Sequence, residues 1–255
     1  MRLQAHVAVV TGASSGIGQA IAIALAREGA AVILVDHEDR KGVQETGARI
    51  SAAGGNAHVV EADIRAEADV ERLFSEAAAA LGTVTLLVNS AGVDSGGKKV
   101  RDMSLDQWEN VLRTNLTGAF LAARAFLRGL GDAPGKIINI SSVHQEIPRV
   151  GAAEYCASKG GLHMLTRTLA LEGAPNRVTA NVIAPGMVLT PMNQEAIDDP
   201  KVLEEQVQSI PLKRAAKPEE VAALAVYLAG PDADYISGAT FMIDGGLHIN
   251  LGQGA

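Results

Sequence analysis

Features that stabilise exported or membrane-bound proteins are scarce in this chain. Its 255 residues include one cysteine, Cys156, which excludes an internal disulfide and is typical of a reducing compartment. No apolar run reaches the roughly 18 residues that a transmembrane helix needs. The first expected strand begins at His6, which leaves no room for a signal peptide. We therefore expect a cytoplasmic protein that does not bind a membrane.

Basic residues are outnumbered, with 22 Lys and Arg against 29 Asp and Glu and a net charge of -7. Without a basic stripe, the chain is not expected to bind nucleic acid. Its six histidines show no zinc-type spacing with each other or with acidic residues, so we expect no metal site. No histidine is placed to activate Cys156, which we interpret as a small core residue rather than a nucleophile.

Short apolar runs alternate with helical segments along the whole chain. The expected strands are residues 6–11, 30–36, 57–61, 83–88, 136–140, 177–183 and 240–243. The expected helices are residues 19–28, 40–53, 67–81, 104–130 (one helix or two abutting ones), a helix that carries Tyr155 and ends near 172, and 218–229. This alternation predicts an α/β fold of Rossmann type, a doubly wound parallel sheet of about seven strands with helices on both faces. We expect one domain over residues 1–255, with a helical flap at about 189–211 that closes over the site.

A glycine-rich turn joins the first expected strand to the first helix. It reads Gly12-Ala-Ser14-Ser15-Gly16-Ile17-Gly18. Glycines allow a tight bend, and the free N–H groups at the start of a helix bind a pyrophosphate. The glycines could instead serve the turn geometry alone, but the flanking strand and helix favour a dinucleotide site.

The second strand ends at Asp36, twenty residues past Gly16. An acidic residue at this distance accepts the hydroxyls of an adenosine ribose and repels a 2′-phosphate. Neither Ser15 nor His37 supplies a fixed cation, so we expect NAD rather than NADP. An exposed loop aspartate is the alternative. Asp63, after the third strand, is either an adenine ligand or a turn and helix-capping residue.

Tyr155 and Lys159 are the candidate catalytic pair, four residues apart in one expected helix. They leave the same helix face, where the ammonium would lower the tyrosine pKa and allow general acid–base chemistry. Ser142, at the end of the fifth strand, could bond the same substrate oxygen. Asn115 lies within the 104–130 helix as a surface residue, as a core amide bonded to backbone, or at a kink that exposes a carbonyl.

Taken together, these motifs resemble the short-chain dehydrogenase/reductase family over nearly the whole chain. They are Thr11-Gly-Ala-Ser-Ser-Gly-Ile-Gly18, Asn89-Ser-Ala-Gly92, Asn115, Ser142, Tyr155-Cys-Ala-Ser-Lys159, and Pro185-Gly186 with Thr190. Within the family, segments 142–148, 190–193, 210–220 and 253–254 are most similar to bacterial glucose 1-dehydrogenases and related aldose dehydrogenases. Two departures are Ser90, in place of a second asparagine, and Asp94, where the glucose enzymes tend to have glutamate in a shorter loop. The first affects packing near the cofactor, and the second bears on substrate identity.

The resemblance implies a role for each matching residue. Tyr155 is the base, Lys159 lowers its pKa and bonds the nicotinamide ribose, Ser142 holds the reacting oxygen, and Asn115 supports a proton-relaying water. The expected cofactor-binding residues are Gly12, Ser14, Ser15, Gly16, Ile17, Gly18, Asp36, Asp63, Ile64, Asn89, Ala91, Gly92, Tyr155, Lys159, Pro185, Gly186, Val188 and Thr190. The expected substrate-binding residues are Asp94, Ser142, His144, Tyr155 and Asn193, where Asp94, His144 and Asn193 could instead be solvated loop side chains.

The resemblance leaves the substrate of the enzyme open. We expect an aldose-like sugar, and the alternatives are a 3-oxoacyl or general ketone reductase and a polyol or rhamnose-type dehydrogenase. A dinucleotide-binding sensor without catalysis would be expected to have lost Ser142, Tyr155 or Lys159, and all three are present. The family also implies a homotetramer, with one interface at residues 104–130 and 152–172 and a contribution from residues 245–255 to another.

Overall fold

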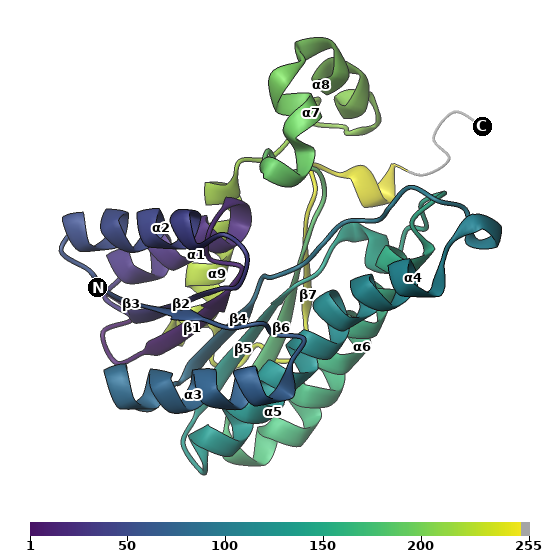
Figure 1. Cartoon of the computed structure of the whole chain (residues 1–255). Coiled ribbons are helices and arrows are strands. Elements are labelled where there is room, and N and C mark those ends of the chain that lie inside the picture. Colours follow the sequence, from purple (N-terminus) through teal and green to yellow (C-terminus); the bar gives the residue numbers. More distant parts are fainter. Residues whose placement is uncertain (251–255) are drawn as a thin grey trace.

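A seven-stranded parallel sheet runs through the computed structural model, which describes residues 1–250 (Figure 1). The strands are β1 (Val7–Thr11), β2 (Ala31–Asp36), β3 (Asn56–Glu61), β4 (Leu86–Asn89), β5 (Gly135–Ile140), β6 (Val178–Pro185) and β7 (Thr240–Ile243). Their order is β3-β2-β1-β4-β5-β6-β7, which confirms the predicted doubly wound fold. The direction of winding reverses between β1 and β4, and ligands of such sheets bind in the crevice at that reversal.

Both faces of the central strands are buried, which explains why their sequences are continuously apolar. In β1, Ala8 and Val10 belong to one hydrophobic cluster, whereas Val9 between them belongs to the cluster on the other face. Strand β4 starts at Leu86, three residues later than predicted, and β6 runs on to Pro185, which the sequence placed just after the strand. Proline fits there because it ends the strand.

Two helical layers cover the sheet (Figure 1). The helices are α1 (Gly16–Arg27), α2 (Arg40–Ala52) and α9 (Pro218–Ala229) on one face, and α3 (Glu67–Leu81), α4 (Leu105–Leu112), α5 (Gly118–Leu130) and α6 (Ala153–Gly173) on the other. Among residues 1–250, no helix combines the length and the apolar character needed to cross a bilayer.

The predicted helix at residues 104–130 is two helices joined by a π-helical turn. This turn, Arg113–Thr117, separates α4 from α5 and contains Asn115. A single π-turn inserts one extra residue per hydrogen-bonded ring and often marks a functional site. The π-turn widens the helix at Asn115.

The predicted flap consists of two short helices near the strand ends, α7 (Gln194–Asp198) and α8 (Pro200–Gln206). They stand above the body of the molecule in Figure 1. All strands are parallel, so the turns that follow them gather at one edge of the sheet, below this flap. The turns that lead from helices into strands, such as those at Gly54 and Gly82, lie at the opposite edge. A side chain at either glycine would meet no atom within 4 Å.

Candidate active site

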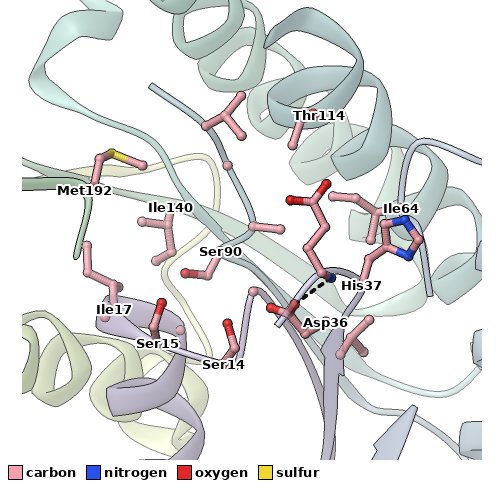
Figure 2. A pocket seen from close by; sticks show the side chains of 18 of the residues that line it. Ser14, Ser15, Ile17, Asp36, His37, Ile64, Ser90, Thr114, Ile140 and Met192 are labelled. Atoms are coloured by element: carbon pink, nitrogen blue, oxygen red, sulfur yellow. Dashed lines mark hydrogen bonds between the residues drawn. The ribbon is translucent and has the colours of Figure 1, made fainter. Parts of the chain in front are cut away.

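A cavity of about 500 Å³ opens at the carboxyl edge of the sheet, above β1 and β4. The predicted site residues that line it are Gly12, Ser14, Ser15, Gly16, Ile17, Gly18, Asp36, Asp63, Ile64, Ala91, Gly92, Asp94, Tyr155, Lys159 and Thr190. Figure 2 shows Ser14, Ser15 and Ile17 on the glycine-rich turn, Asp36 at the end of β2 with His37 just after it, and Met192 at the flap. The cavity therefore brings together turns that are up to 180 residues apart in the chain.

The other predicted residues do not line this cavity. They are Asn89, Asn115, Ser142, His144, Pro185, Gly186, Val188 and Asn193.

Close backbone packing shapes the glycine-rich turn. Gly12 has a left-handed backbone, with φ +67°, and a Cβ there would lie 2.8 Å from the Cα of Ala91. A Cβ on Gly18 would lie 2.1 Å from the carbonyl oxygen of Gly12. The Thr11 hydroxyl accepts hydrogen bonds from the N–H groups of Ser90 and Ala91, at 3.1 Å each. The turn after β1 and the turn after β4 are thus held against each other at the cavity floor.

The start of α1 faces this floor. Its N-cap, Ser15, forms no side-chain cap to the helix within the described chain, so the first N–H groups remain free of a capping oxygen. A 12-residue helix with free N–H groups at its N-terminus is suited to bind a phosphate group. Thr190 lies close to the start of this helix, since a Cβ on Gly16 would lie 3.1 Å from its side chain.

Asp36 occupies the far end of the cavity, where the sequence predicted an adenosine ribose site. Its Oδ1 accepts hydrogen bonds from the backbone N–H groups of Glu38 (3.1 Å) and Asp39 (2.9 Å). Among residues 1–250, Oδ2 has no hydrogen-bond partner. One carboxylate oxygen is therefore fixed by the turn, and the other is available to a ligand (Figure 2).

Asp63 forms a turn, as one of its two predicted readings proposed, and it also lines the cavity. Its Oδ1 accepts from the backbone N–H of Arg65 at 2.9 Å, and the Arg65 side chain donates to both carboxylate oxygens. Hydrogen bonding to Arg65 lowers the pKa of Asp63. Arg65 is a lining residue that sequence reasoning missed, although it lies only two positions past Asp63. It places a cation at the adenosine end, but that cation is already paired.

Tyr155 and Lys159 project from α6 into the other end of the cavity. Tyr155 is 9% exposed and Lys159 is 5% exposed. The Lys159 Nζ lies 5.6 Å from the centre of the Tyr155 ring and donates to the Ile140 carbonyl at 3.0 Å. Ser142 follows β5 and is also buried, and its hydroxyl accepts from the His144 backbone N–H at 3.2 Å.

Burial dominates the proton affinities of this pair. Desolvation raises the pKa of Tyr155 above its ordinary value of 10.0, although hydrogen bonding to Ser142 and the charge of Arg149 oppose the rise. Desolvation also lowers the pKa of Lys159 to about 8, opposed by the charge of Asp94. The sequence prediction of a lowered tyrosine pKa is therefore wrong for this structure. The loss of hydration outweighs the nearby cations.

Asn115 is a buried core amide bonded to backbone, as one of its predicted alternatives proposed. Its Oδ1 accepts from the Val93 N–H at 2.8 Å, and its Nδ2 donates to the Val93 carbonyl at 2.9 Å. The same Nδ2 donates to Ser158 Oγ at 3.2 Å. Asn115 thus joins the segment after β4 to the helix that carries Tyr155.

Other predicted residues have structural partners. Asn89 donates to Asn139 Oδ1 at 2.8 Å inside the sheet. Asn193 donates to the Val188 carbonyl at 2.8 Å and so anchors the start of the flap. The His144 ring lies edge-on to the Tyr155 ring, with 6.1 Å between centres, and its Nδ1 is 2.9 Å from the Ile147 carbonyl oxygen.

The strand end that precedes the flap has its own contacts. Pro185 is the last residue of β6, and the N–H of Gly186 donates to the carbonyl of Ile243 in β7. Both residues therefore belong to the pairing of β6 with β7, and neither lines the cavity. Within residues 1–250, no group of three or more His, Cys, Asp or Glu side chains is arranged to hold a metal ion.

Arg149 is a further residue at the mouth that the sequence did not indicate. Its Nη2 lies 2.7 Å from Asp94 Oδ1, and its guanidinium carbon lies 5.8 Å from the centre of the Tyr155 ring. It belongs to no motif and follows a proline in an irregular segment, so only the fold brings it to this position.

Comparisons with known proteins agree with this geometry. Residues 12–248 match the family model described as enoyl-(acyl carrier protein) reductase. Glucose 1-dehydrogenase 2 of Bacillus subtilis is 40% identical over 98% of this chain and 98% of its own length. The 3beta-hydroxysteroid dehydrogenase 1 of Eggerthella lenta is also 40% identical, over 99% of this chain and 98% of its own length.

Solved structures with a similar fold are also dehydrogenases or reductases. A short-chain dehydrogenase/reductase from Serratia marcescens superimposes with a TM-score of 0.91 and 35% identity, covering 97% of this chain and 100% of that one. A dehydrogenase/reductase from Sinorhizobium meliloti gives a TM-score of 0.91 and 36% identity, covering 96% of each chain. This chain therefore belongs to the short-chain dehydrogenase/reductase family of nicotinamide-dependent oxidoreductases.

Proposed function

We propose that this enzyme is an NAD-dependent dehydrogenase of a glucose-like aldose, acting on the hydroxyl at carbon 1. The observation that carries the proposal is the convergence of Tyr155, Lys159 and Asp94 at one end of a cavity whose other end holds Asp36. The first three residues provide acid–base chemistry and a polar substrate contact. Asp36 provides a ribose acceptor.

The residues of the chain supply proton transfer and orientation. A bound nicotinamide supplies the hydride acceptor. The Tyr155 oxygen takes the proton of the substrate hydroxyl, and the Ser142 hydroxyl holds the substrate oxygen in place. Because Lys159 uses one N–H on the Ile140 carbonyl, two of its three donors remain for other acceptors, including a ribose. Asn115 fixes the backbone of Val93 beside these groups, and its predicted support of a proton-relaying water is part of the proposal.

Access to the cavity is controlled by the segment that starts the flap. Thr190, Pro191 and Met192 line the cavity, and α7 and α8 follow directly. Movement of these helices toward the sheet would exclude water from the reacting groups. Thr190 and the backbone at Val188 are the proposed contacts for the carboxamide of the cofactor.

The polar groups near Tyr155 and the Bacillus relative favour a sugar substrate. Glucose 1-dehydrogenase 2 acts, by its name, on glucose, and it is 40% identical to this chain. A second candidate is oxidation of an apolar secondary alcohol, since the hydroxysteroid dehydrogenase is equally similar. Asp94 and Arg149 at the mouth argue against it, because an apolar substrate would make no hydrogen bond to this ion pair.

An activity panel tests the reaction and the base. We expect the wild type to reduce NAD with D-glucose or a related aldose. Tyr155→Phe should lower kcat by at least about 100-fold, the lower range for loss of a positioned acid–base group, with NAD affinity nearly unchanged. Turnover of steroid or simple alcohols but not of sugars would replace the aldose assignment by the second candidate. Substantial activity of Tyr155→Phe would remove Tyr155 as the base.

A second experiment tests the preference for NAD. Asp36→Ala should raise the ratio of kcat/KM for NADP to that for NAD, because the repulsion of a 2′-phosphate and the ribose hydrogen bonds are both lost. Glu45→Ala, which removes an exposed carboxylate of α2 that does not line the cavity, serves as the control and should leave the ratio unchanged. An equal ratio in wild type and Asp36→Ala would refute the ribose role.

We also propose that the enzyme is a cytoplasmic homotetramer. Phe120 on α5 and Met164 and Leu171 on α6 are exposed apolar side chains on the outer layer of the fold, where the sequence predicted one interface. Part of the predicted second interface, at residues 245–255, lies outside the described residues. The single cysteine supports a reducing compartment.

A further inference from the structure

An ion pair joins two loops across the mouth of the cavity. The Arg149 Nη2 lies 2.7 Å from Asp94 Oδ1 and donates to Ser95 Oγ, also at 2.7 Å. Asp94 itself lines the cavity, and the Arg149 guanidinium lies over the Tyr155 ring, 5.8 Å from its centre. A substrate whose reacting carbon is at the Tyr155 oxygen would therefore have its remaining atoms beside this pair.

The loop that carries Asp94 is anchored from below. The Gly96 N–H donates to Glu154 Oε1 at 3.1 Å, and Gln107 Nε2 donates to the same oxygen at 3.0 Å. Glu154 is fully buried and immediately precedes Tyr155 in α6. The helix that carries the base therefore also fixes the position of the Asp94 loop, which places the ion pair at a defined distance from Tyr155.

Stability does not account for this ion pair. Both side chains are roughly 40% exposed, at 41% for Arg149 and 37% for Asp94. Exposed pairs of this kind contribute little to stability. Arg149 uses only Nη2, so its Nε and Nη1 donors have no partner among residues 1–250, and Asp94 Oδ2 is likewise free there. The pair thus offers spare donors on one side and a spare acceptor on the other.

We propose that Arg149, together with Asp94, is a specificity-determining residue that binds adjacent hydroxyl groups of a neutral polyhydroxy substrate. This inference rests on the proposed aldose dehydrogenase function. A sugar hydroxyl both donates and accepts, so one can donate to Asp94 Oδ2 while its neighbour accepts from the Arg149 guanidinium. An anionic sugar acid would have to displace Asp94 from Arg149. An alcohol without further hydroxyls would leave both charged groups without a ligand partner.

The test compares two substrates in each variant. Arg149→Met keeps the aliphatic stem and removes the donors, and the kcat/KM values are measured for D-glucose and for cyclohexanol. Because Arg149 also acts on the Tyr155 pKa, rates with both substrates can change, and the ratio of the two kcat/KM values isolates specificity. We expect Arg149→Met to lower this sugar-to-alcohol ratio by about 10- to 100-fold, the effect of one or two charge-assisted hydrogen bonds, mainly through KM.

Matched variants complete the design. Asp94→Leu should lower the ratio similarly, and the double variant should lose less than the two single losses combined, because the two side chains hold each other in place and loss of either disturbs the other. Arg101→Met, an exposed arginine paired with Asp102, should leave the ratio unchanged. NAD affinity and the thermal unfolding midpoint identify variants that fail to fold.

Each outcome separates the two proposals. A wild type that oxidises glucose, combined with a lowered ratio in Arg149→Met, supports the inference. If the wild type oxidises glucose and Arg149→Met keeps the wild-type ratio, only the role of Arg149 is overturned. If the wild type has a higher kcat/KM for gluconate, an anionic sugar acid, than for glucose, the requirement for a neutral substrate is overturned. A wild type without sugar turnover overturns the proposed function and this inference together.

Discussion

Tyr155, the proposed base, and its neighbouring lysine show how burial and charge compete at single residues. Tyr155 is nearly buried, and desolvation raises its pKa even with two cationic groups within 6 Å of its ring. Lys159 experiences the same desolvation with the opposite sign, which lowers its pKa to about 8. In the proposed mechanism, proton transfer at neutral pH needs positive charge close to the phenol, and in this structure Arg149 is the cation whose charge lowers the Tyr155 pKa.

The lowered pKa of Lys159 predicts a specific pH dependence of stability. The unfolded lysine holds its proton up to about 10.5, whereas the folded one releases it near 8. Between these values the unfolded state binds more protons, so the free energy of unfolding rises with pH across that window. The difference of about 2.5 pKa units corresponds to about 3 kcal/mol. Below pH 8 the penalty for burying the charge is fully present.

Urea unfolding of wild type and Lys159→Met at pH 7 and pH 10 measures this effect. The wild type should gain stability relative to Lys159→Met as the pH rises, by up to about 3 kcal/mol. Lys41→Met, which alters a lysine whose side chain is 89% exposed, is the control and should show no such change. Parallel curves for wild type and Lys159→Met would mean that Lys159 is not desolvated in the folded protein.

Residues with a chemical role in a motif were predictable from the sequence, whereas Arg149, Glu154 and Arg65 were not. Tyr155 and Lys159 could be paired because helical spacing alone puts them on one face. Arg149 meets Asp94 across 55 residues and depends on two irregular loops. No periodicity or turn rule specifies how such loops fold over a cavity.

At the scale of elements, the first strand, the glycine-rich turn and α1 form a unit with almost no free space. Its ends were predictable, because apolar β-branched residues and glycines mark them clearly. The π-turn at Arg113–Thr117 was not, because its sequence continues the helical pattern of the flanking segments. It is stabilised by the contacts of Asn115 with Val93 and Ser158, which are visible only in three dimensions.

The packing at Gly18 allows a sharp test of this unit. In Gly18→Ala the new methyl group would lie 2.1 Å from the Gly12 carbonyl oxygen, so the turn or the helix has to shift. We expect a loss of about 1–3 kcal/mol of stability, as for other overpacked sites, together with weaker NAD binding. Thermal unfolding and NAD titration measure the two effects.

Gly129→Ala is the matched control for this substitution. Gly129 lies within α5, and a methyl group there would meet no atom within 4 Å. Replacing an interior helical glycine by alanine should stabilise the protein by about 0.5–1 kcal/mol. If Gly18→Ala is as stable as wild type and binds NAD normally, the turn can move away from α1 far enough to accept a methyl group, contrary to this prediction.

For the whole molecule, the order of the strands decides where chemistry occurs. The sequence predicted seven parallel strands and two helical layers because β and α patterns alternate throughout, and the structure confirms this arrangement. The strand order, which reverses between β1 and β4 at the cavity, was not predicted, because alternation alone does not specify it. The substrate was not specified either, because it depends on the loops above the sheet.

The proposed tetramer gives a prediction at this scale. Changing Met164 to Glu would place a charge on the exposed face of α6, and a charge buried in an interface is costly. We expect light scattering to give the mass of four chains for wild type and a smaller assembly for Met164→Glu. Tyr235→Glu, at an exposed residue outside α5 and α6, should keep the wild-type mass. A monomeric wild type, or an unchanged mass for Met164→Glu, would contradict the proposed interface.

The two edges of the sheet differ in a way that matters for use of the enzyme as a catalyst. The turns at Gly54 and Gly82 lie at the edge away from the cavity, and both are exposed. Attachment to a bead or an electrode through these turns would therefore orient the mouth toward the surrounding liquid. Immobilised in this way, the enzyme should remain accessible to substrate and coenzyme, whereas attachment through the flap would block the entry of both.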